Sequence, residues 1–323
     1  MHPTRALSAI LTFLLLFSCH PVFSADETAV DAAIDRGLAW IMAHPATCQD
    51  GGFLDIVDEG LFYLTIRRLG SGKMPDALHE RAFEDCISRL EASPEFERRL
   101  KKQDKTLFEQ YHLLLATYLI ETVRKPAVSH DRVIAEARRT LANSSSENQT
   151  FRLTVALLIQ HLGATPPVSM AELLDASLVN RVTQRDVSKL PGQPPHRSTF
   201  QRPLAYYALV HEVAALTDFG RLPPSPWLIE RRSRIGRILQ DGALRAMVSA
   251  HVDLLAEMLL CNHMLDLAMT GELLAGVDFL VASQHADGSW GEQVTSPRTN
   301  RVRHAVQTAT AALLAYKTTS RAH

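Results

Sequence analysis

Apolar residues recur at intervals of three and four along almost the whole chain, as in the run from Leu273 to Val281. This period is typical of amphipathic helices, and no convincing alternation of apolar and polar residues predicts a strand. About twelve helical segments follow one another between short breaks, and they fall into six successive pairs. The predicted fold class is therefore all-α, built from about six helical hairpins.

The breaks between the segments carry turn formers, such as the asparagines and serines of 142–147 and the prolines of 223–226. None has the composition of a domain linker, so residues 25–323 are predicted to form a single domain. The predicted pairs are Ala29–Ala43 with Ile56–Leu69, Met74–Glu91 with Lys105–Val123, Asp131–Leu141 with Gln149–Leu162, Met170–Val179 with Arg202–Thr217, Pro226–Leu239 with Leu244–Met269, and Glu272–Ser283 with Val302–Lys317.

One segment near the C-terminus combines several turn signals. After a helix, the chain reads Gln284-His285-Ala286-Asp287-Gly288-Ser289-Trp290-Gly291-Glu292. The Asp-Gly step can reverse the chain, because Asp hydrogen-bonds its own backbone and Gly tolerates positive φ. A weaker copy follows the first helix, from Gln49 to Phe53.

This pattern resembles the QW-type repeat of squalene and terpene cyclases and of protein prenyltransferase β-subunits. The resemblance implies an α/α toroid, a ring of helical hairpins in which the second helix of each pair lines a central cavity. It points to a fold more than to a reaction. The Asp-x-Asp-Asp acid motif and the Asp-Asp-x-x-Asp metal motif of terpene cyclases are both missing from the sequence.

The N-terminus has the features of a secretory signal peptide. A short basic start precedes an apolar run from Ala6 to Phe17, and Val22 and Ser24 suit a cleavage site before Ala25. Residues 1–24 are thus predicted to be removed, and the protein to be periplasmic or secreted. A lipoprotein with an acylated Cys19 is the less favoured alternative.

The remaining composition narrows the partners. A net charge of −1 gives no basic excess for nucleic acid, and no second apolar run is long enough for an integral membrane span. A small-molecule or peptide substrate is therefore expected. In an oxidising compartment, Cys48 and Cys86 are the pair favoured for a disulfide if one forms, which leaves Cys261 as a free thiol or a small buried apolar residue.

The candidate chemistry lies on the helices expected to face inward. A polar residue inside an apolar helix must be partnered or must face a cavity, so each of these residues is expected to be hydrogen-bonded or to line the cavity. They are Glu109, His112, Arg152, His211, Glu212, Asp253, Glu257, Cys261, His263, His304 and Gln307.

A metal site is the sharpest hypothesis they support. Asp253, Glu257 and Cys261 follow at intervals of four, which stacks them on one helix face. The prenyltransferase resemblance implies a zinc-binding His at the start of the last inner helix, a position that His304 matches, although the Asp-x-Cys element is absent. The predicted metal ligands are His211, Cys261, His263 and His304, with zinc first and copper or iron second. Glu257 and Glu212 are the predicted catalytic residues.

Two other functions remain open from the sequence. The ring is a non-catalytic binding module for a peptide, lipid or protein if the inner polar residues form only a hydrogen-bonded core network. It is a carbohydrate-active hydrolase or lyase if Glu257 faces Glu109 or Glu212 across the cavity. The low aromatic content of 7% does not favour a sugar cleft.

Overall fold

The protein is all-helical, as the apolar period predicts. The computed structural model describes residues 26–47, 52–69, 76–124, 130–144, 149–184, 203–291 and 299–322. Within these ranges there are fourteen helices and no strand. The predicted all-α fold class is confirmed.

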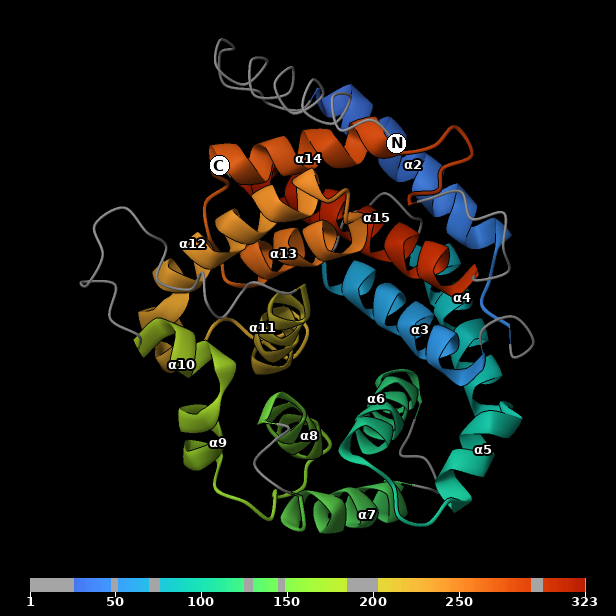
Figure 1. Cartoon of the computed structure of the whole chain (residues 1–323). Helices are drawn as coiled ribbons and strands as arrows, with labels where there is room; N and C mark the ends of the chain where they lie inside the picture. The colour runs from blue at the N-terminus through green and yellow to red at the C-terminus, as the bar shows by residue number, and fades with distance from the viewer. Residues whose placement is uncertain are drawn as a thin grey trace, which may run out of the picture.

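Six helices form an inner ring (Figure 1). Each contacts the next one along the chain, and the last, α15, returns to contact the first, α3. The inner helices are α3 (Gly52–Leu69), α6 (Leu107–Val123), α8 (Gln149–His161), α11 (Pro203–Leu216), α13 (Val252–Met264) and α15 (Thr299–Ala322).

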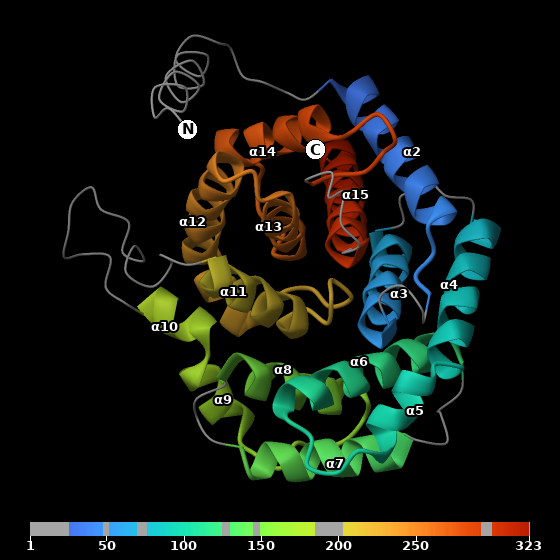
Figure 2. The ribbon, with the colours of Figure 1, turned by 45° about the vertical axis from the view of Figure 1, so that its right-hand side comes forward.

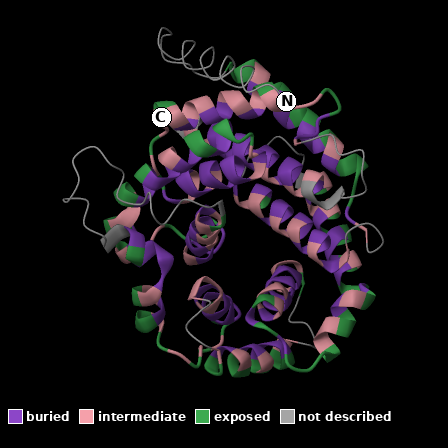
Figure 3. Cartoon of the chain, in the orientation of Figure 1, coloured by how far each residue is buried: buried purple, intermediate pink, exposed green. Residues whose placement is uncertain are grey.

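The other eight helices lie outside this ring, which the turned view in Figure 2 also shows. Their exposed residues gather on the outward faces, and their buried residues face the inner helices (Figure 3). The outer helices are α2 (Glu27–Ala43), α4 (Asp76–Glu91), α5 (Pro94–Lys101), α7 (His130–Ala142), α9 (Met170–Ala176), α10 (Leu178–Gln184), α12 (Pro226–Val248) and α14 (Gly271–Ser283).

Most helix boundaries differ from the predicted ones by a few residues, and three departures are larger. Helix α5 was missed, although Ser93 caps it and Pro94 occupies its first turn. The segment predicted at Met170–Val179 is split into α9 and α10 at Ser177, whose backbone is extended. Helix α12 continues to Val248 rather than ending at Leu239, so the chain reverses about ten residues later than predicted.

The Gln-to-Trp segment joins the two ends of the chain. The Gln284 amide donates to Ala33 O at 2.9 Å and accepts from Arg36 at 2.7 Å, both on α2. Trp290 is fully buried and donates from its indole nitrogen to Leu280 O. Gly288 has φ +91°, and a Cβ there would lie 2.4 Å from Arg36 O. The motif thus fixes the last helical pair against the first.

Several sequence predictions concern residues outside the described ranges. The signal peptide, Cys19 and Cys48 are among them. Cys86 is described: it is a buried free thiol that donates to Ile56 O. In the part of the chain that is described, no helix is both apolar enough and long enough to cross a membrane.

Candidate metal centre

The inner helices enclose a cavity with a volume of about 260 Å³. Five of the six supply lining residues at helical spacing, such as Asp58, Leu61, Phe62 and Thr65 on α3. Small-molecule sites in proteins have volumes of about 300–1,000 Å³, so this cavity suits a compact ligand.

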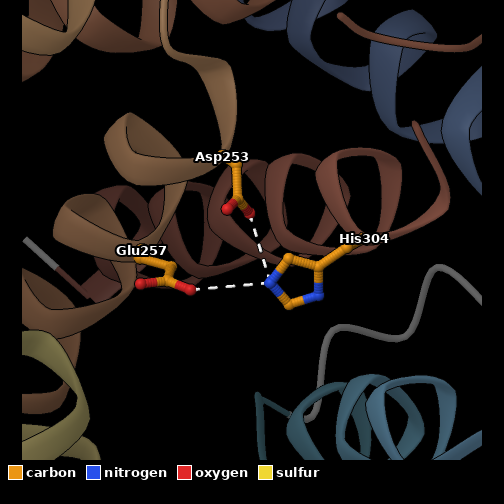
Figure 4. A group of neighbouring side chains, drawn as sticks. All are labelled: Asp253, Glu257 and His304. Carbon is orange, nitrogen blue, oxygen red and sulfur yellow. Dashed lines mark ion pairs between the residues drawn. The ribbon is translucent and has the colours of Figure 1, made fainter. Parts of the chain in front are cut away.

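Three side chains of metal-ligating type converge beside this cavity: Asp253 and Glu257 on α13, and His304 on α15. Glu257 and His304 line the cavity, and Asp253 lies next to them. The Nε2 atom of His304 lies 3.4 Å from Asp253 Oδ1 and 3.6 Å from Glu257 Oε1. Figure 4 shows the two carboxylates directed at this nitrogen. One oxygen or nitrogen from each residue lies within 4.8 Å of the others.

These separations fit a common metal ion. With metal–ligand bonds of about 2.0–2.2 Å in tetrahedral geometry, neighbouring ligand atoms lie about 3.3–3.6 Å apart. Both distances from His304 Nε2 are close to this interval. In addition, Glu257 Oε2 is buried without a hydrogen-bond partner. Such an orphaned carboxylate oxygen is costly unless a cation or another donor compensates it.

Neighbouring groups hold one candidate ligand, Asp253, by hydrogen bonds and place a carboxylate behind another, His304. The Tyr207 hydroxyl donates to Asp253 Oδ2 at 2.6 Å, and the Thr308 hydroxyl donates to Asp253 Oδ1 at 2.9 Å. Asp58 of α3 lies on the far side of the His304 ring, with 3.7 Å between its Oδ2 and Nδ1, which is longer than a hydrogen bond; Nδ1 is buried without a hydrogen-bond partner. A carboxylate behind a histidine ligand is the usual way in which proteins orient a metal-bound imidazole.

The electrostatics of the cluster favour a cation. Burial lowers the pKa of His304, but the surrounding carboxylates outweigh it and raise that pKa well above its usual range. Burial raises the pKa of Glu257, against the interaction with His304 that lowers it. Three carboxylates therefore favour positive charge at the imidazole, and a divalent ion bound to Nε2 would have to take the place of its proton.

The other predicted metal ligands are distributed differently. His211 lines the cavity, and its Nε2 lies 3.9 Å from Glu257 Oε1. Cys261 also lines it, but its thiol donates to Val210 O, and burial raises its pKa well above the usual range. His263 is not among the lining residues; its Nδ1 contacts the Thr319 hydroxyl at 2.9 Å.

The helix geometry explains why Cys261 stays apart from the cluster. Eight residues of α-helix separate Asp253 from Cys261 by about 12 Å along the axis, far beyond the span of one ion's ligands. Four residues separate Asp253 from Glu257 by only about 6 Å, which two side chains can close. His263 points away because six residues rotate it by about 240° from Glu257.

The second predicted catalytic residue, Glu212, lies outside the cavity lining. Its carboxylate accepts hydrogen bonds from Leu178 N, Val179 N and the Thr150 hydroxyl, so it caps the start of α10. Glu109 forms a capping box with Thr106 at the start of α6 and pairs with Lys102. The structure therefore does not bring either glutamate to face Glu257.

Of the remaining polar residues predicted to face inward, two line the cavity and one does not. His112 lines the cavity, where its Nδ1 contacts Phe108 O. Gln307 lines it as well, and Arg152, on α8, does not. Asp58, Tyr207 and Thr308 were not singled out from the sequence. The sequence offered one indication of Asp58, which is a charged residue on a predicted inner helix. It gave no indication that Asp58 lies next to His304, because the two are far apart in the sequence.

The fold and the site together define a class of protein: an all-helical ring whose central cavity carries a carboxylate–histidine cluster. The chain belongs to the family described as a domain of unknown function (DUF6895), which matches residues 59–320. These residues include all three members of the cluster, Asp253, Glu257 and His304, and Asp58 lies directly before the matched range. No curated protein and no solved structure matches the chain.

Proposed function

We propose that the protein is an exported, metal-dependent enzyme that acts on a peptide or an apolar small molecule in its central cavity. The observation that carries this proposal is the convergence of Asp253, Glu257 and His304 at metal-ligand separations. The orphaned Glu257 Oε2 gives a second reason to place a cation there. A transferase or hydrolase of α/α-toroid type is the reaction class that the QW resemblance and this cluster favour.

The donor set indicates which ion to expect. Two carboxylates and one imidazole suit zinc best, with iron or copper as the alternatives. Three protein ligands would leave at least one position for water or substrate, and an ion bound in this way polarises a carbonyl or activates water. Cys261 contributes no ligand in this arrangement, which distinguishes it from the Asp-Cys-His set implied by the prenyltransferase resemblance.

The surrounding residues would carry out the remaining tasks. Asp58 would orient the His304 ring, and Tyr207 and Thr308 would hold Asp253. His211 lines the cavity beside Glu257 with a partly exposed side chain, so it is the candidate for proton transfer to or from a bound substrate.

Metal analysis tests the proposal directly. Purified protein, loaded separately with zinc, iron(II) or copper and then dialysed, should retain about one ion per chain. His304→Ala should lose it, since one of three ligands is removed. His263→Gln is the matched control, because His263 lies on α13 without lining the cavity, and it should retain the ion. Failure of the unaltered protein to retain any of the three ions would refute the metal site.

Export is a separate proposal with its own test. N-terminal sequencing of the protein recovered from its native compartment should begin at Ala25 if the signal peptide is cleaved as we propose. A start at an acylated Cys19 would favour the lipoprotein alternative, and a start at Met1 would contradict export by either route.

A non-catalytic binding module is the second candidate. The hydrogen bonds that Tyr207 and Thr308 donate to Asp253 tie α11 and α15 to α13, as a structural network would. In that case Asp253→Asn should lower the melting temperature strongly, and neither the unaltered protein nor any variant should retain a metal ion. The carbohydrate-hydrolase alternative would need a carboxylate pair other than Glu257 with Glu109 or Glu212.

A further inference from the structure

The two ends of the cavity differ in chemistry. Asp58, Glu257 and His304 lie toward the starts of their inner helices and surround the polar end. One and two helical turns further along, the lining becomes mainly apolar, with Thr65, Gln307 and Thr308 as the polar exceptions. The apolar lining includes Leu61, Phe62, Leu115, Leu260, Met264 and Ala311. A ligand that fills this cavity must therefore be polar at one end and apolar at the other.

The apolar end is closed by the turn that follows α11, residues 217–222. Phe219 from this turn lines the cavity and is 8% exposed. Figure 2 shows the turn reaching from α11 toward α3. Asp218, Phe219 and Gly220 have φ values of +49°, +52° and +82° in succession. Two non-glycine residues in the left-handed region are unfavourable, so the surrounding contacts must hold them there.

Those contacts come from the ends of three inner helices. Arg68 of α3 donates to the carbonyl oxygens of Asp218 and Phe219. The Tyr118 hydroxyl of α6 donates to Asp218 Oδ1 at 2.7 Å, and His161 of α8 lies 3.8 Å from the same oxygen. The side chain of Asp218 is fully buried. The turn is thus fastened across the ring opposite the carboxylate–histidine cluster.

We infer that the ligand is a compound with one polar head group and an apolar tail, and that Phe219 sets the tail length the cavity accepts. The head lies among Asp58, Glu257 and His304, and the end of the tail packs against the Phe219 ring. This inference deepens the proposed function by naming its substrate class and a specificity-determining residue. The contacts from Arg68 and Tyr118 hold the strained turn, and the turn places the Phe219 ring at the floor of the cavity.

Two homologous series of probes test it. The n-alkyl hydroxamic acids carry a metal-binding head, and the n-alkan-1-ols carry a head that binds metal poorly. In each series the affinity of the full-length mature protein, measured by calorimetry, should rise about fourfold per added methylene and then stop rising at one chain length. In Phe219→Ala this limit should move to longer chains, and in Phe219→Leu it should move less.

Phe96→Ala is the matched control, because Phe96 is a similarly buried phenyl ring on α5 that does not line the cavity. It should leave the length limit unchanged. Affinity that is independent of chain length, or a limit that Phe219→Ala leaves in place, overturns the inference. The metal proposal is judged separately. Hydroxamic acids that bind no more tightly than alkanols of the same chain length count against the metal. If Phe219→Ala still moves the chain-length limit in the alkanol series, that result supports the role of Phe219 whether or not a metal is bound.

Discussion

At the scale of single residues, Asp58 is the position whose role was hidden in the sequence. It lies behind the His304 ring, 246 positions earlier in the chain, and the two meet only because α3 and α15 are neighbours in the closed ring. We expect Asp58→Asn to weaken metal affinity by about 10–100-fold, since removing a carboxylate behind a histidine ligand has effects of this size. Competition with a chromophoric chelator measures it.

The control for that experiment is Asp85→Asn, which alters an exposed carboxylate on α4. It removes the same charge far from the cavity, so its metal affinity should equal that of the unaltered protein. Equal affinities in both variants would show that Asp58 does not orient His304.

His263 allows a pH prediction that is independent of the metal. Burial lowers its pKa in the folded protein. As pH falls through the unfolded value of about 6.5, the unfolded chain takes up a proton that the folded protein resists, so stability is lost toward acid. His263→Gln should lose less free energy of unfolding between about pH 7.5 and pH 5 than the unaltered protein. Urea denaturation at the two pH values measures the difference, and equal losses in the two proteins would contradict it.

At the scale of helices and turns, the Gln-to-Trp segment carries the clearest stability prediction. Gly288→Ala would place a Cβ 2.4 Å from Arg36 O at a φ of +91°. Backbone on both sides must then shift, so we expect a loss of about 2 kcal/mol or more. Gly163→Ala is the matched control, with φ +79° and nothing within 4 Å of the added Cβ. It should cost only about 1 kcal/mol. Thermal unfolding compares them, and equal costs would show that the α2 contact is unimportant.

Most elements, but not all of the site, follow from local signals in the sequence. The apolar period located the inner helices, and the i, i+4 spacing placed Asp253 beside Glu257 on one face. The short α5 was missed because its eight residues are mainly charged, and its apolar face consists of little more than Phe96 and Leu100. Glu212 is kept out of the cavity lining by its hydrogen bonds to the start of α10, and a helix start at that position was not predicted. The turn at Asp218 is fixed by Arg68 and Tyr118, which no local pattern connects to it.

At the scale of the whole molecule, the proposed metal would join two helices of the ring. Its ligands lie on α13 and α15, and α15 also contacts α3 and α2, so the ion would reinforce the region where the last helices return to the first. An ion that binds only the folded protein stabilises it by about 2.7 kcal/mol at a free concentration one hundred times its dissociation constant.

Removing the metal should therefore lower the melting temperature by several degrees. About 1 kcal/mol corresponds to roughly 2–4 °C for chains of 150–250 residues and to somewhat less for this longer chain, so chelation should lower it by about 4 °C. Differential scanning calorimetry of the loaded and chelator-treated protein measures the change. In Glu257→Gln the two curves should coincide, because the orphaned carboxylate that calls for a cation is gone. An equal shift in that variant would place the stabilising ion elsewhere in the chain and would leave the central cavity to its organic ligand alone.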